Sequence, residues 1–113
     1  MARSLAVLGT LVVASGGTTS GWLNSKLGFS RATDIVVFGP AAATGTFGVE
    51  VSWLDVPGVT DYGKLKIDGT QVSVGALDAA VCPSSSFKSF RVKSTLAEAA
   101  DRTLIVMGQL EVS

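Results

Sequence analysis

Histidine is missing from this chain of 113 residues, and cysteine occurs once, as Cys82. Without histidine, the sequence lacks the usual general base for neutral pH and the commonest metal ligand of proteins. A single cysteine cannot form an internal disulfide, so we expect Cys82 to be a small buried residue, with an intermolecular bridge as the alternative. It is also a poor candidate for a catalytic nucleophile.

Charge is scarce as well. Only 16% of the residues are charged, and nine basic residues balance nine acidic ones. Nucleic-acid-binding proteins usually carry a basic excess that neutralises phosphates, so no nucleic-acid partner is expected. The apolar content of 47% excludes a disordered chain. With a mean hydropathy of +0.46, we expect neighbouring proteins to cover part of the apolar surface, a well-filled small sandwich being the alternative.

Motifs for catalysis and cofactor binding are also missing. Neither GxxxxGK[ST] nor GxGxxG occurs among the thirteen glycines, so no phosphate loop is predicted. The acidic residues are scattered, mostly at predicted turns, where Asp bonds to the local backbone. A calcium site formed by Asp55, Asp61 and Asp68 is a weaker alternative. We therefore expect no catalytic residues, no cofactor and no metal; a small hydrolase or lyase is the least favoured function.

Residues 1–15 have two interpretations. Arg3, the apolar stretch 5–14 and the small residues after it resemble a bacterial secretion signal. Gly9 and Thr10 interrupt that stretch, however, and it is too short to cross a bilayer as a helix, so no membrane partner is expected. We expect a strand or assembly arm, buried on both faces or lying under a neighbouring subunit. One face of it carries Leu5, Val7, Leu11 and Val13.

The remaining residues, 16–113, have the pattern of a single β domain, because glycines separate short runs with period-two alternation or β-branched residues. The clearest strand is 46–54, where Phe47, Val49, Val51 and Trp53 share one face and Trp53 is expected in the core. Residues 64–74 predict a hairpin whose Asp68-Gly69 pair suits a type I′ turn. Further strands are predicted at 22–29, 33–38, 87–94 and 103–112. In the last of these, one face carries Leu104, Val106, Gly108, Leu110 and Val112.

Two segments have weaker patterns. Residues 75–80 are irregular or form one helical turn, and residues 95–102 have the only real helix propensity. The fold class expected is all-β: a single antiparallel β-sandwich or jelly-roll-like barrel of about seven to eight strands with one short helical turn.

Aromatic and basic residues near loops are the other candidates for an interface. Trp22 and Tyr62 border loops, and both residue types are enriched where proteins meet. A sugar-stacking platform that also includes Trp53 is the alternative. Arg91, Lys93 and Arg102 flank the 95–102 connection, where they are expected to pair with Glu98 and Asp101 or, at a subunit contact, to set its register.

The segments 46–52, 87–94, 97–102 and 103–108 together resemble the small β-sandwich virion structural proteins of tailed bacteriophages. The resemblance implies a non-enzymatic capsid decoration (cement) protein, or a head–tail or tail-associated component. Its localisation would be the virion, assembled in the host cytoplasm. Its partners would be copies of itself or other virion proteins such as a major capsid protein. It also implies that an apolar terminal arm pairs with the sheet of a neighbour.

The leading hypothesis is therefore a structural protein of a phage particle that stabilises the capsid by packing against the shell or neighbouring copies. Its interface candidates are Leu5, Val7, Leu11, Val13, Trp22, Tyr62, Arg91 and Arg102. The alternative is a secreted or surface carbohydrate-binding or adhesin-like module, which would require removal of the N-terminal segment and an exposed aromatic platform.

Overall fold

The computed structural model describes residues 2–27 and 30–112, and its strands form two larger sheets and a small hairpin. Sheet A has the order β1 (Ala2–Val13), β12 (Arg102–Val112), β4 (Ser30–Phe38), β10 (Ala79–Cys82), and β3 (Lys26–Leu27) also pairs with β4. Sheet B has the order β2 (Leu23–Asn24), β11 (Ser89–Ser94), β5 (Phe47–Ser52), β6 (Gly63–Lys64), and β9 (Ser73–Val74) also pairs with β5. The hairpin is β7 (Lys66–Ile67) and β8 (Thr70–Gln71).

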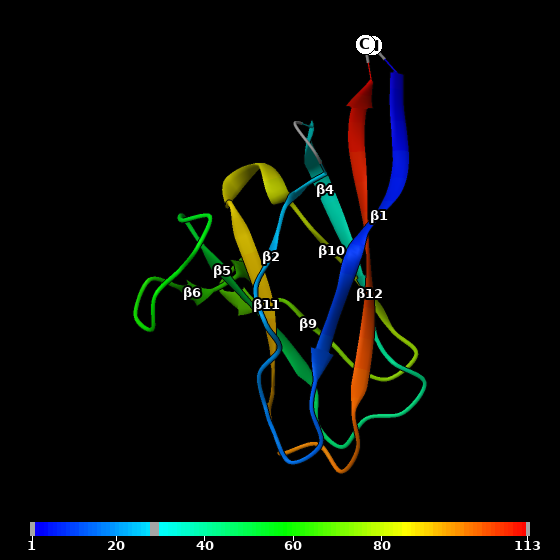
Figure 1. The fold of residues 1–113 in the computed structure, drawn as a ribbon, viewed down its shortest axis with the longest axis vertical. Coiled ribbons are helices and arrows are strands. Elements are labelled where there is room, and N and C mark those ends of the chain that lie inside the picture. The colour runs from blue at the N-terminus through cyan, green and yellow to red at the C-terminus, as the bar shows by residue number, and fades with distance from the viewer. Residues whose placement is uncertain (1, 28–29, 113) are drawn as a thin grey trace.

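The two larger sheets pack face to face, so the protein is an antiparallel β-sandwich, as the sequence predicted (Figure 1). The core forms where the inner positions of both sheets meet, because alternate residues of a strand point to the same side. Its largest fully buried apolar side chains are Phe47, Phe90, Ile35, Leu104, Val13, Val37, Val49, Val74, Val92 and Val106.

Strand β12 alternates as its sequence requires. Leu104, Val106 and Leu110 are buried in the core, whereas Ile105 lies on the outside. The same alternation holds in β5, where Phe47 and Val49 are in the core. The predicted faces of these two strands are thus confirmed as far as the strands extend.

Strand β1 breaks the predicted alternation. Its pairing with β12 shifts by one residue between Val7 and Gly9, which is a β-bulge. A bulge exchanges the two faces of a strand, so Leu11 and Val13 point into the core while Leu5 and Val7 are 59% and 55% exposed. The prediction that these four residues share a face is therefore wrong. Because β1 pairs with β12 along its length, it is an integral strand of sheet A.

Three local predictions also differ from the structure. Trp53 lies beyond the end of β5 and is 61% exposed instead of buried, because the strand ends at Ser52. Residues 95–101 form turns and bends instead of a helix, and the one short 3₁₀ helix is at Ser84–Ser86 among the described residues. In the segment 75–80, residues 75–78 are irregular as expected, and only the last two belong to strand β10, which begins at Ala79.

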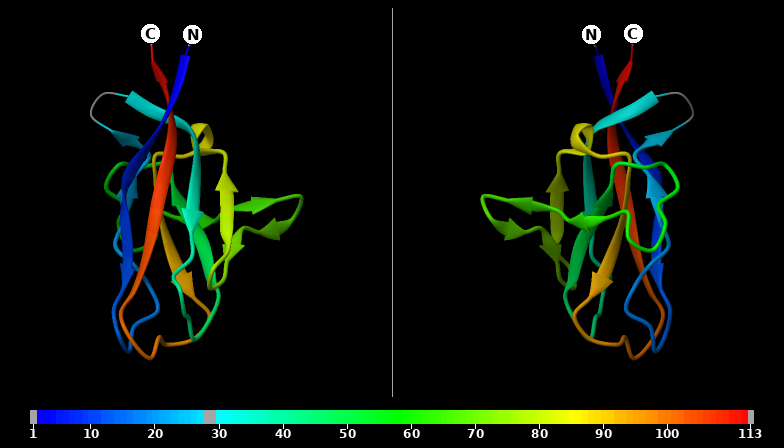
Figure 2. Two further views of the ribbon diagram at one scale, coloured as in Figure 1. Left: turned by 90° about the vertical axis from the view of Figure 1, so that its right-hand side faces the viewer. Right: turned by 90° about the vertical axis from the view of Figure 1, so that its left-hand side faces the viewer.

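The predicted hairpin is confirmed. Asp68 and Gly69 have φ angles of 53° and 80°, the positive values that a type I′ turn needs. Its base, β6 and β9, pairs with β5, and β7–β8 projects from the body of the sandwich (Figure 2). Interruptions such as that between β6 and β7 divide the predicted strands into shorter ones, twelve in the described part of the chain. That part contains no helix that is both long and apolar enough to span a membrane.

Candidate functional site

The structure places the eight predicted interface residues in four different surroundings. Leu5 and Val7 lie on the outer surface of sheet A, and Leu11 and Val13 are buried in the core. The other four lie apart from sheet A's outer surface: Trp22, Tyr62 and Arg91 contact one another, and Arg102 binds Glu98. The predicted interface residues are therefore divided between two surfaces, the core and the separate contact of Arg102 with Glu98.

The outer surface of sheet A contains an apolar patch that crosses all four of its main strands. Two rows of paired residues cross all its main strands, β1, β12, β4 and β10 in that order; one row is Val7, Met107, Val36 and Val81, and the other is Thr10, Ile105, Phe38 and Ala79. Both rows point away from the core, since their strand neighbours Ile35, Val37, Leu104 and Val106 are buried. Only Thr10 in these rows is polar, and none of the eight is charged. We call this surface, with Leu5 and Val12, the apolar face; the left view of Figure 2 looks onto its strands.

Most side chains of the apolar face are open to solvent. Val81 is 61% exposed, and Leu5, Val7, Val12, Phe38 and Ile105 are each at least two-fifths exposed. Single exposed apolar residues are normal on protein surfaces, but a contiguous exposed patch marks a surface that contacts another molecule.

The β1 edge of sheet A adjoins the apolar face and has little protection. Natural edge strands are kept from pairing with other chains by charges, prolines, bulges or shortness, and of these the stretch from Ser4 to Val13 has the bulge between Val7 and Gly9. From Ser4 to Val13, β1 has no charge and no proline, and in the described part of the chain it pairs only with β12. The opposite edge, β10, is four residues long and is followed by Pro83. The molecule therefore presents one long, open edge and one short one.

Sheet B has a different outer surface, centred on an ion pair. Arg91 Nε on β11 donates to Glu50 Oε1 on β5 over 2.8 Å, and only 4% of Glu50 is exposed. The Arg91 guanidinium lies 4.7 Å from the Trp22 ring centroid and 4.4 Å from that of Tyr62. Such cation–π contacts stabilise the arginine in addition to the charge pair.

The contacts of this cluster bear on two predictions, the ion-pair partner of Arg91 and the sugar-stacking platform. Arg91 was expected to pair with Glu98 or Asp101, but it pairs across the strands with Glu50 because the two residues are register partners. The rings of Trp22 and Tyr62 lie 5.7 Å apart at an angle of 59°. A sugar platform would need free ring faces, and the guanidinium takes one face of each ring.

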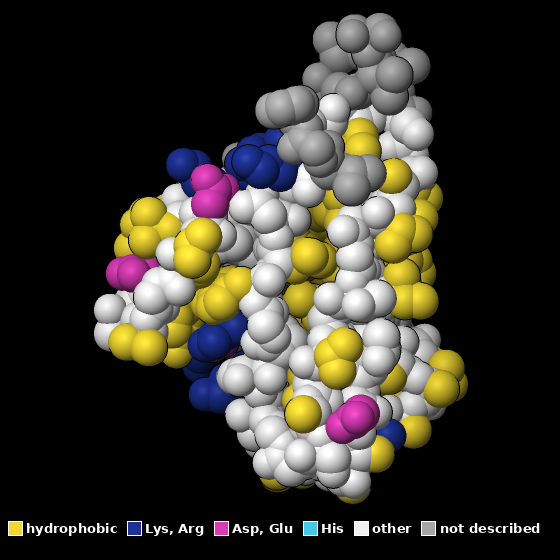
Figure 3. Space-filling model, viewed as in Figure 1, with side chains coloured by type: hydrophobic (Ala, Val, Ile, Leu, Met, Phe, Trp, Pro, Cys, Tyr) yellow, Lys and Arg dark blue, Asp and Glu magenta, His cyan; other side chains and the backbone are white. Residues whose placement is uncertain are grey.

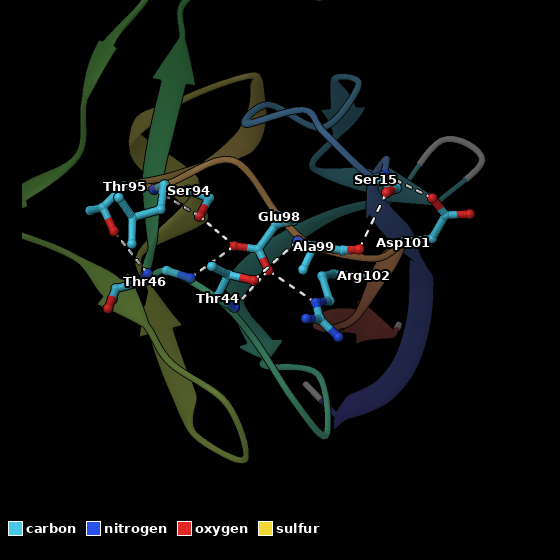
Figure 4. A network of polar contacts seen from close by, with 11 residues as sticks. Ser15, Thr44, Thr46, Ser94, Thr95, Glu98, Ala99, Asp101 and Arg102 are labelled. Carbon is cyan, nitrogen blue, oxygen red and sulfur yellow. Dashed lines mark hydrogen bonds and ion pairs between the residues drawn. The ribbon is translucent and has the colours of Figure 1, made fainter.

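Glu98 forms the second polar network, at the end of the sandwich opposite the termini (Figure 4). Its carboxylate accepts hydrogen bonds from the Thr44 and Gly45 backbone amides, the Ser94 hydroxyl and Arg102 Nε, at 2.6–3.0 Å. Burial alone would raise the pKa of Glu98, but these four donors hold it at about 2. Arg102 thus pairs with Glu98 as predicted, within a network that ties three loops together.

The remaining titratable candidates have local roles. Asp55 accepts from the Asn24 side-chain amide, which together with nearby basic residues lowers the pKa of that carboxyl. Asp61 accepts from the Gly58 amide, and Asp68 occupies the hairpin turn. These three do not form a calcium site: no three His, Cys, Asp or Glu side chains come together as one in the described ranges. Cys82 is fully buried, and burial raises the pKa of its thiol to about 12.

Comparison of the chain with family models, curated proteins and solved structures finds no match.

Most of the apolar face was not predicted from the sequence. Val36, Phe38, Val81, Ile105 and Met107 were not among the predicted interface residues. A signal for them exists, since residues 35–38 are apolar at four successive positions and therefore on both sides of the strand. Such a strand is covered on both sides in a parallel sheet; in this antiparallel sandwich only one side is covered.

Proposed function

We propose that this protein is a non-enzymatic structural component of a phage particle, which packs its apolar face against the shell or against neighbouring copies. The observation that supports this most is the continuity of the apolar face over the four main strands of sheet A. The resemblance of residues 46–52, 87–94, 97–102 and 103–108 to tailed-phage virion proteins supports the particle as its location.

The size of the apolar face shows how much of a contact it can supply. With strands about 4.8 Å apart and outward residues about 6.8 Å apart along a strand, its ten residues cover roughly 330 Å² in projection before side-chain relief is added. A stable interface takes about 800 Å² from each partner. The apolar face therefore supplies the centre of a specific contact, which the adjoining β1 edge and the surrounding surface would complete.

Light scattering at several protein concentrations tests the packing surface. We compare the wild-type chain with Val7→Lys/Ile105→Lys, which puts two charges in the apolar face, and with Val59→Lys/Leu77→Lys, which puts two charges in exposed loops. The proposal expects self-association or binding to purified shells that the first variant loses and the second retains. Equal behaviour of both folded variants would contradict it.

Mass spectrometry of purified phage particles tests the location. Particles induced from a host that carries the gene should contain peptides of this chain in many copies, and an extract of the same cells serves as the control. Absence of these peptides from intact particles, when the extract contains them, would overturn the virion assignment.

A further inference from the structure

The outer surface of sheet B contains a hollow of about 290 Å³ beside the Arg91–Glu50 pair. It is open to solvent and is lined by polar groups, chief among them Glu50, Lys64, Lys93, Gln71, Thr46 and Ser73. In Figure 3 lysine and arginine side chains gather around a depression over β6 and β11. We call it the basic groove. It is smaller than most drug-sized ligand pockets and has room for one or two sugar rings.

The groove has an unbalanced positive charge. Its only carboxylate, Glu50, is already bonded to Arg91. The side chains of Lys64 and Lys93 form no ion pair or hydrogen bond with any residue that the structure describes. Two free ammonium groups in a concave surface concentrate positive potential there, which favours an anionic ligand.

Strand register explains how these groups come together. Arg91, Glu50 and Lys64 are paired in one row across β11, β5 and β6, and Lys93, Gly48 and Ser73 are paired in the next row across β11, β5 and β9. Gly48 has no side chain, and the Gln71 amide occupies the space above it. The ligand-facing groups are thus fixed on paired strands.

The chemistry of the lining favours a saccharide over a peptide. A peptide usually binds a β protein by adding a strand to an open edge. Strand β5 beneath the groove has no open edge here, since β11 pairs with one side and β6 and β9 with the other. The groove offers hydroxyls of Thr46, Ser73 and Thr95 and the amide of Gln71, groups that hydrogen-bond to sugar hydroxyls.

We propose that the basic groove binds a carboxylate-bearing saccharide, with Lys64 and Lys93 contacting the carboxylate and the hydroxyl and amide groups contacting the ring. This site is on the sheet opposite the apolar face and does not depend on the proposed function. A protein that packs by one face has the other available for such a ligand.

The test is a titration of the full chain with a tetramer of galacturonic acid, followed by amide chemical shifts and calorimetry. Shifts should centre on β5, β6 and the end of β11. The variant Lys64→Met/Lys93→Met should bind roughly tenfold more weakly or not at all, because it removes both charge-assisted contacts. The matched control is Lys66→Met, an exposed lysine of β7 outside the groove; it should bind as the wild type does.

Three further probes distinguish binding of an acidic saccharide from binding of a neutral sugar or of any anion. A neutral galactose tetramer, hexaglutamate and inorganic phosphate should each bind at least roughly tenfold more weakly than the acidic tetramer. Equal binding of hexaglutamate or phosphate would overturn the saccharide assignment, as would absence of binding by the acidic tetramer. Loss of binding in Lys66→Met equal to that in the double variant would overturn the location.

Discussion

Val36 and Glu50 both point away from the core, each from an inner strand of its sheet, and their surroundings differ. Val36 has apolar neighbours on either side in its row, Met107 and Val81, and the row is largely open to solvent. Glu50 is buried beneath its own sheet's side chains and bonded to Arg91. Outward position alone thus says little about exposure.

This difference identifies the surface that another molecule is needed to cover. On sheet B the charges of Arg91 and Glu50 neutralise each other within the chain, so this ion pair needs no partner molecule. On sheet A the apolar side chains leave water only if another molecule covers them, and the free energy of that burial is about 25 cal/mol per Å² of apolar surface. The apolar face is therefore the surface on which binding of another protein should change stability most.

Glu98→Ala should produce the largest loss of stability. It tests whether the Glu98 network, which joins Ser94 of sheet B to Arg102 of sheet A, holds the two sheets together. It leaves two backbone amides, the Ser94 hydroxyl and the Arg102 guanidinium without their acceptor, so we expect a loss of about 3–5 kcal/mol in the free energy of unfolding. Urea unfolding measures it. Asp101→Ala is the control, because this exposed carboxylate accepts one hydrogen bond, from the Ser15 amide. Equal losses in both variants would contradict the role of Glu98.

The same network predicts a pH dependence. In the folded protein the pKa of Glu98 is about 2, below its ordinary value of 4.5. Between these values the unfolded chain binds the proton that the folded chain does not, so this part of the stability is complete above pH 4.5 and is lost as the pH falls toward 2. Melting temperatures from pH 6 to pH 2 should fall more in the wild type than in Glu98→Gln. Parallel curves would show that Glu98 does not contribute.

Two substitutions in one strand sharpen the assignment of faces. Leu11→Ala removes a fully buried side chain and should lower the free energy of unfolding by about 2–5 kcal/mol. Val7→Ala, on the apolar face, should change it by less than about 0.5 kcal/mol in the monomer. Denaturant titration at low protein concentration measures both. Similar losses would mean that the bulge between them does not exchange the faces.

A second pair compares the two outer surfaces directly. Glu50→Gln leaves Arg91 without its charge partner and should cost about 2 kcal/mol of unfolding free energy. Ile105→Thr should cost less than about 1 kcal/mol and should reduce self-association. Unfolding and light scattering on the same samples check this. An unchanged free energy of unfolding in Glu50→Gln would contradict this comparison.

The sequence predicted the sandwich, the hairpin and the inner faces of β5 and β12, because these depend on period two and on turn residues such as Asp68-Gly69. It could not place Trp53, since the point at which β5 ends is set by the following loop and not by alternation. The bulge after Val7 was also hidden, because both faces of β1 are apolar and either phase fits. Glu50 and Arg91 are 41 positions apart, and only strand order makes them partners.

The smallest expected effect concerns Cys82. Burial raises the pKa of its thiol to about 12, so almost no thiolate forms at pH 8. We expect no reaction with a thiol reagent such as dithionitrobenzoate in the folded protein and one equivalent in guanidinium chloride. Rapid labelling of the native protein would show that the strand bearing Cys82 opens readily.

The pairing of β1 with β12 also determines when this protein can fold. The paired residues are roughly ninety or more positions apart, so a ribosome releases the apolar strand β1 long before its only described strand partner. Closing so long a loop is slow, and an unpaired apolar strand is prone to aggregate in the meantime. We therefore expect the segment from Ser4 to Val13 to be exposed to chaperones during synthesis, since sheet A is completed only when the last strand has emerged.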